Sequence, residues 1–264
     1  MKKWNKSIRI AAVTVLLAGC VVLVTLAVGR LPKRSPAERK PAIAKSVERP
    51  AVYDSVLLTR FTQTIRSLDF NRRECTYRGI ISMHDPGDSL NNVRGLEFLF
   101  ARSGDDYYYK VGNAEIIHRT HTNLFIQNDQ QRVVLSDQGI ELKAPMGDLI
   151  ALEKALQSEH YQLTNAFKGH EETMSLSNEH HISCKELSVT LDTGSHKLQR
   201  IYIRLTTLSD PLNNTKDRTV EVHISELGTK ANLQQYPAVD DVIDKAGRPW
   251  QLTGKYKDYK LIML

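Results

Sequence analysis

The sequence contains few cysteines and none of the short signatures of common catalytic sites. Cys20 lies in an N-terminal apolar run, which leaves only Cys75 and Cys184 in the rest of the 264-residue chain. These two form one disulfide in an oxidising compartment if the fold brings them together, and otherwise stay as two thiols. No Gly-x-Ser-x-Gly motif and no phosphate-binding loop is present. We therefore expect no catalytic residues, no cofactor and no enzymatic activity.

The histidines do not suggest a metal centre. His118 and His121 are three residues apart, and residues three apart on a strand point to opposite faces. His180 and His181 precede Cys184, but zinc needs three or four ligands that converge on one point. We expect no metal site.

The most informative feature that is present is an apolar run near the N-terminus. Residues 1–9 form a basic tail, and the run that follows occupies 10–29. A run of this length crosses a hydrocarbon core of roughly 30 Å as a helix. Leu17-Ala18-Gly19-Cys20 also matches the cleavage site of a bacterial lipoprotein signal, in which case Cys20 would carry lipid. We favour the transmembrane signal anchor, because the run stays apolar after Cys20, which a cleaved signal does not need.

A proline-rich and basic segment over 30–50 separates the apolar run from the rest of the chain. It has prolines at 32, 36, 41 and 50 and few apolar side chains to bury. Proline opposes both helix and sheet, so the composition predicts an extended linker. Its lysines and arginines compete with those of the N-terminal tail in setting the orientation of the anchor.

The charge distribution argues against nucleic-acid binding. The chain has a formal net charge of +6, but residues 1–49 hold eleven of its 36 Lys and Arg and two of its 30 Asp and Glu. Residues 50–264 therefore hold 25 basic and 28 acidic residues, a net charge of −3. A nucleic-acid-binding domain needs its basic excess on the folded surface.

Residues 51–264 are expected to form a single α+β domain. Asp54 or Ser55 can cap a helix over 54–68, whose apolar side chains recur at helical spacing. Period-two alternation and turn signals then predict a mainly antiparallel sheet, interrupted by a second helix over 146–156. The strands are expected over 76–83, 96–101, 107–111, 115–119, 123–128, 131–136, 161–167, 172–176, 184–191, 198–205 and 218–225, with one or two extended pieces in 250–264.

The order of these elements resembles the bacterial lipoprotein-localisation carriers of the periplasm and outer membrane. The similarity is carried by the opening helix, the aromatic strand pair over 96–109, the hairpin around 124–129, the helix over 146–156 and the late strands over 187–203. The resemblance implies an unclosed barrel, a curved sheet that wraps around helices and encloses an apolar cavity. It also implies a domain on the periplasmic, extracytoplasmic side of the cell membrane.

We therefore expect a non-enzymatic binding protein, anchored in the membrane, that holds lipid acyl chains or lipoproteins against a concave apolar sheet. The alternative is a scaffold of a cell-envelope assembly, which would bind envelope proteins instead. The side chains expected to line the cavity come from one apolar set on each of several strands. They are Leu96, Phe98, Phe100, Leu124, Ile126, Leu187, Val189, Ile201 and Ile203.

Overall fold

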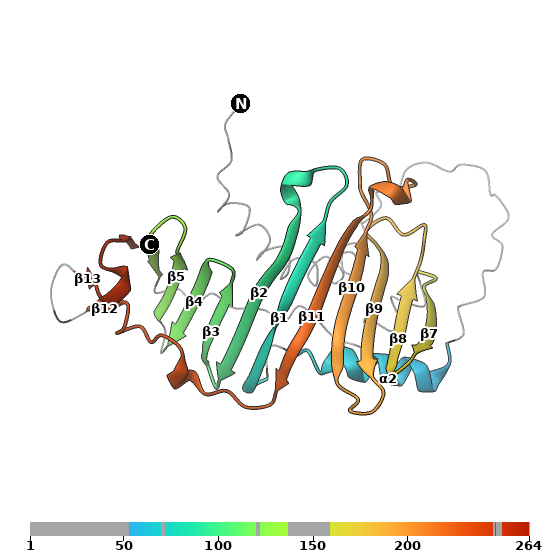
Figure 1. The fold of residues 1–264 in the computed structure, drawn as a ribbon, viewed down its shortest axis with the longest axis horizontal. Coiled ribbons are helices and arrows are strands. Elements are labelled where there is room, and N and C mark those ends of the chain that lie inside the picture. Colours follow the sequence, from blue (N-terminus) through green and yellow to red (C-terminus); the bar gives the residue numbers. More distant parts are fainter. Residues whose placement is uncertain are drawn as a thin grey trace, which may run out of the picture.

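The computed structural model describes residues 53–69, 72–119, 122–136, 159–244, 246 and 250–263. Its body is one curved sheet of twelve strands, preceded by helix α2 (Ser55–Arg66) (Figure 1). The α+β class and the open, mainly antiparallel sheet are as predicted. The predicted anchor over 10–29, with Cys20, the linker over 30–50 and the helix over 146–156 lie outside these residues. No helix in the described part of the chain is long and apolar enough to span a membrane.

Two meanders make up the sheet. The first contains β1 (Glu74–His84), β2 (Val93–Ser103), β3 (Asp106–Val111), β4 (Ala114–Arg119), β5 (Thr122–Gln127) and β6 (Arg132–Ser136). The second contains β7 (Gln162–Lys168), β8 (Glu171–Ser177), β9 (Cys184–Asp192), β10 (Leu198–Leu205) and β11 (Arg218–Gly228). All eleven strands lie within a few residues of the predicted ranges, because each alternates in hydropathy between clear turn signals.

The first and last strands of these meanders join them into one sheet. β11 pairs with β1 antiparallel, so the strand order is β14-β6-β5-β4-β3-β2-β1-β11-β10-β9-β8-β7. A bulge lies in this seam at Arg78 and Gly79. A Cβ at Gly79 would meet the His223 carbonyl oxygen at 2.0 Å and the Phe98 ring at 2.7 Å, so the seam needs a glycine there.

The C-terminal segment after β11 returns along the sheet to its far edge (Figure 1). We call residues 229–263 the tail. It contains η3 (Leu233–Gln235), the small hairpin of β12 (Ile243–Asp244) and β13 (Gln251–Leu252), and η4 (Gly254–Tyr256). It ends in β14 (Lys260–Met263), which pairs in parallel with β6.

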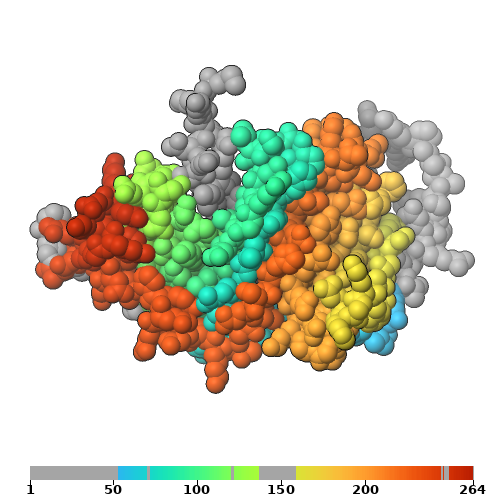
Figure 2. Space-filling view, viewed as in Figure 1, coloured from blue at the N-terminus to red at the C-terminus, as the bar shows by residue number. Residues whose placement is uncertain are grey.

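The two faces of the sheet are covered by different parts of the chain. α2 packs on one face at the β7–β10 end, which we call the helix face. It crosses behind β8 and β9 in Figure 1, and the space-filling view shows those strands in front of it (Figure 2). The tail packs on the opposite face over β3–β6, which we call the tail face. The tail face of β8–β11 instead carries alternating polar side chains, such as Thr173, Ser188 and Glu221.

The two cysteines of the domain are both buried, and neither forms a disulfide among the described residues. Cys75 lies on β1 and Cys184 on β9, with β10 and β11 between these strands. Neighbouring strands are about 4.8 Å apart, so three such steps exceed the separation of roughly 7 Å that a disulfide can span. The conditional Cys75–Cys184 disulfide is therefore not formed.

Candidate functional site

An apolar row crosses the helix face from strand to strand. Phe100, Tyr109, Ile116, Phe125 and Val134 lie directly opposite one another on β2 to β6. Cross-strand partners share a face, so their side chains form a continuous stripe. On β1 the stripe continues to Tyr77, whose ring stacks against Phe100 at a centroid distance of 6.1 Å.

Helix α2 covers the other end of the helix face. Asp54 caps it through hydrogen bonds from the Val56 and Leu57 amides to its carboxylate. Phe61 and Ile65 are then buried against the sheet, in one cluster with the side chains of β8 to β10. An ion pair between Arg60 of α2 and the buried Glu172 of β8 fixes the helix at this position.

Over β2 to β5 the helix face is less completely buried. Phe100 and Val111 are almost inaccessible, but Leu96, Tyr109 and Phe125 remain partly exposed beside them. Among the described residues, α2 is the only α-helix on this face, and it lies over β7–β10. Aromatic and aliphatic surface next to a packed core is the type of surface that binds an apolar ligand.

Tyr109 supplies a polar group to this apolar surface. Its ring meets Phe100 edge-on at 6.3 Å. Burial raises the pKa of its hydroxyl, so the group stays neutral and can donate a hydrogen bond. Within the described part of the chain the Tyr109 hydroxyl has no hydrogen-bond partner, whereas Tyr77 donates to the Asp69 carbonyl oxygen at 2.9 Å.

The nine predicted lining residues do not share one face. Seven lie on the helix face and two on the tail face. Those on the helix face are Leu96, Phe98, Phe100, Leu187, Val189, Ile201 and Ile203. Whether these seven line a cavity stays a prediction.

The assignment of Leu124 and Ile126 to that face is wrong. Both are fully buried against Val242 and Tyr256 of the tail. Their neighbour Phe125 belongs to the helix face. β5 has apolar side chains on both faces, because the tail covers one of them, so alternation alone does not tell which set faces inward.

The run of three tyrosines on β3 divides between the two faces, as strand alternation predicts. Tyr107 and Tyr109 point to the helix face. Tyr108 points to the tail face, where its ring stacks on Tyr236 at 4.9 Å and its hydroxyl donates to Glu115 at 2.8 Å. Tyr109 and Phe125 were not among the predicted lining residues, because the pairing register that aligns them cannot be read from the sequence of one strand.

Solved structures are similar to this chain, whereas no family model and no curated protein sequence matches it. The Mycobacterium tuberculosis lipoprotein LppX is 12% identical, with a TM-score of 0.39 over 68% of this chain and 99% of LppX. A LolA superfamily protein from Nitrosomonas europaea is 8% identical, with a TM-score of 0.27 over 69% and 96%. A DUF1329 family protein from Desulfovibrio piger is 6% identical, with a TM-score of 0.27 over 70% and 95%.

These matches include the LolA superfamily, the lipoprotein-localisation carriers that the order of the elements resembles. All three TM-scores lie below 0.5.

No group of three or more His, Cys, Asp or Glu side chains within the described ranges is placed to hold a metal ion. His118 stacks on Tyr107 at 4.8 Å. The helix face over β2 to β5 thus combines apolar side chains with the Tyr109 hydroxyl, which has no hydrogen-bond partner among the described residues.

Proposed function

We propose that the protein is a membrane-anchored, extracytoplasmic and non-enzymatic binding protein whose helix face holds the acyl chain of a lipid or of a lipidated protein. The observation that carries the proposal is the partly exposed apolar stripe over β2 to β5, which contains the Tyr109 ring, whose hydroxyl has no hydrogen-bond partner among the described residues. The membrane anchor in this proposal is the apolar run over 10–29, which is long enough to cross a bilayer as a helix.

The chemistry of the stripe fits a fatty acyl chain. Burying the aliphatic Val134 and the aromatic Phe125 against a methylene chain is favourable, because the chain displaces water from them. The Tyr109 hydroxyl can donate to an ester carbonyl or a carboxylate, which would fix the polar end of the ligand. A charged substitution in the stripe should therefore oppose binding directly.

Photo-crosslinking tests this proposal. The full chain is reconstituted in phosphatidylcholine nanodiscs, exposed to a diazirine-bearing palmitate, and the labelled peptides are mapped by mass spectrometry. We expect crosslinks in β2, β3 and β5. Phe125→Glu should reduce them about tenfold, because it places a charge against the chain. Tyr109→Phe should weaken palmitate binding about threefold to tenfold, by removing one hydrogen bond.

Ile80→Glu is the matched control. Ile80 lies on the opposite face of β1 and is 42% exposed, so a carboxylate there meets water rather than the stripe. It should leave both the crosslinks and the urea midpoint nearly unchanged. Crosslinks that are absent from the wild type, or that survive Phe125→Glu undiminished, would contradict the proposal and leave the envelope scaffold as the better function.

A further inference from the structure

Four exposed aliphatic side chains lie at one end of the sheet. Among the described residues, Leu90, Ile182, Leu208 and Leu212 are 63%, 70%, 75% and 82% exposed. They belong to three loops, over 85–92, 178–183 and 206–217. Four of the eight large apolar side chains that are exposed in the described part of the chain therefore lie at this end of the sheet.

The strand pairing places these three loops next to one another. His84 at the end of β1 pairs with Thr219 of β11, and Leu205 at the end of β10 pairs with both Arg218 and Cys184. The Thr206 amide also donates to the Ser183 carbonyl oxygen at 3.0 Å, which joins two of the loops directly. Figure 2 shows the loops over 85–92 and 206–217 side by side.

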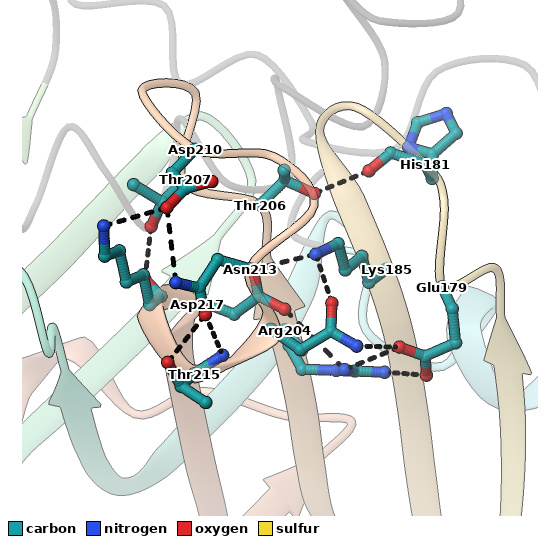
Figure 3. Close-up of polar contacts among 12 residues, drawn as sticks. Glu179, His181, Lys185, Arg204, Thr206, Thr207, Asp210, Asn213, Thr215 and Asp217 are labelled. Carbon is teal, nitrogen blue, oxygen red and sulfur yellow. Dashed lines mark hydrogen bonds and ion pairs between the residues drawn. The ribbon is translucent and has the colours of Figure 1, made fainter.

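A buried polar network fixes the loops over 178–183 and 206–217 (Figure 3). Lys185 is fully buried and binds Asp217 at 3.1 Å and Asn214 at 2.7 Å. Arg204 pairs with Glu179 from the neighbouring loop. Breaking the buried Lys185–Asp217 pair would leave an uncompensated charge, so this pair holds the end of the loop over 206–217 against β9, whereas the Glu179 side chain is 49% exposed.

The loop over 85–92 is held in the same manner. The buried Asp85 carboxylate accepts hydrogen bonds from the amides of Gly87 and Asp88 and from the side chain of Asn91. Asp88 then caps η1 (Ser89–Asn91), which carries Leu90. In these loops Asp85, Thr206 and Asp217 are buried, whereas the four aliphatic side chains are exposed beside other polar residues.

We propose that the tips of these three loops insert into the interfacial region of a lipid bilayer. Separate aliphatic side chains on rigid loops suit a fluid hydrocarbon boundary, which adapts to their shape. Charges around the tips are mixed, with Asp88 and Asp210 beside Arg94 and Lys216. Attraction to anionic headgroups is therefore not required, and uncharged bilayers should suffice.

The chain itself keeps a bilayer within reach of these loops. If residues 10–29 span a membrane, the linker over 30–50 extends to roughly 65 Å at about 3.1 Å per residue. β1 is about 36 Å long at about 3.3 Å per residue, so the linker can pass along the whole sheet. The inference does not depend on the proposed acyl cargo, because it concerns the loops and not the helix face.

Lipid-borne quenching tests the inference. The full chain with Cys20→Ser is placed in phosphatidylcholine nanodiscs. A fluorophore is attached at Leu208→Cys or at Leu90→Cys. Cys75 and Cys184 are buried and stay unlabelled. Nitroxide groups on the acyl chains should quench these labels at least about threefold more than a label at Asp105→Cys. Asp105 is exposed in the β2–β3 turn at the opposite end of the sheet.

A second variant separates insertion from mere proximity. Leu208→Asp with Leu212→Asp should abolish quenching at Leu90→Cys without moving the urea midpoint, because both side chains are largely exposed. Equal quenching at positions 208 and 105 would overturn the inference. The inference would also be overturned by labels that are shielded from solvent in native membranes but not in bilayers of pure lipid, because such shielding would indicate a protein partner. Quenching without palmitate crosslinks would keep the inference and reject the proposed cargo.

Discussion

At the residue scale, the least expected feature is a fully buried lysine. Lys185 follows directly after Cys184 at the start of β9, and its charge is compensated by Asp217 from the end of the loop before β11. Arg204 lies 3.7 Å from the same carboxylate. Nothing in the alternation of β9 predicts this burial, because the partner comes from a segment 32 residues away.

The buried pair gives a prediction on stability. Lys185→Met leaves the Asp217 carboxylate buried with only Arg204 nearby, and should cost about 3–5 kcal/mol of unfolding free energy. Lys185→Met combined with Asp217→Asn should recover most of this loss, because no net charge stays buried. Urea denaturation of the full chain in detergent measures both. A double variant as unstable as the single one would contradict the explanation.

At the scale of elements, strands and turns follow from local sequence. Which segment packs on which face of the sheet does not. A helix cap at Asp54 or Ser55 was predicted, and Asp54 is the residue that caps α2, since cap chemistry depends on neighbouring residues. The position of the tail was not. Its buried side chains, Val239, Val242 and Tyr256, have no strand or helix period, so nothing in the sequence indicates that it covers β5.

The tail gives a prediction that distinguishes the two faces of β5. Ile126→Glu places a carboxylate at a fully buried position under the tail and should cost several kcal/mol of stability or prevent folding. Ile80→Glu, at a position 42% exposed on the same face of the sheet, should cost well under about 1 kcal/mol. Urea midpoints of the two variants test this. Equal and small losses would show that the tail leaves this face open.

At the scale of the whole molecule, buried tyrosines lie in both halves of the sheet and on both of its faces. Tyr77 and Tyr107 lie in the core of the helix face, Tyr108 under the tail, and Tyr161 beside α2. Burial raises the pKa of all four hydroxyls, and for Tyr107 to about 12. A buried phenol resists ionisation because its charged form loses solvation.

The fold should therefore lose stability in alkali. A tyrosine in the unfolded chain ionises near pH 10, whereas Tyr107 in the fold stays protonated until about pH 12. Between these values the unfolded state releases protons that the folded state retains, so stability is complete below pH 10 and falls as the pH rises towards 12. At pH 11 each such tyrosine should remove about 1.4 kcal/mol. Urea denaturation at pH 9 and pH 11 measures the loss, and Tyr107→Phe should reduce it by one tyrosine's share. If the variant loses as much stability between pH 9 and pH 11 as the wild type, then the pKa of Tyr107 does not differ between the unfolded and folded states.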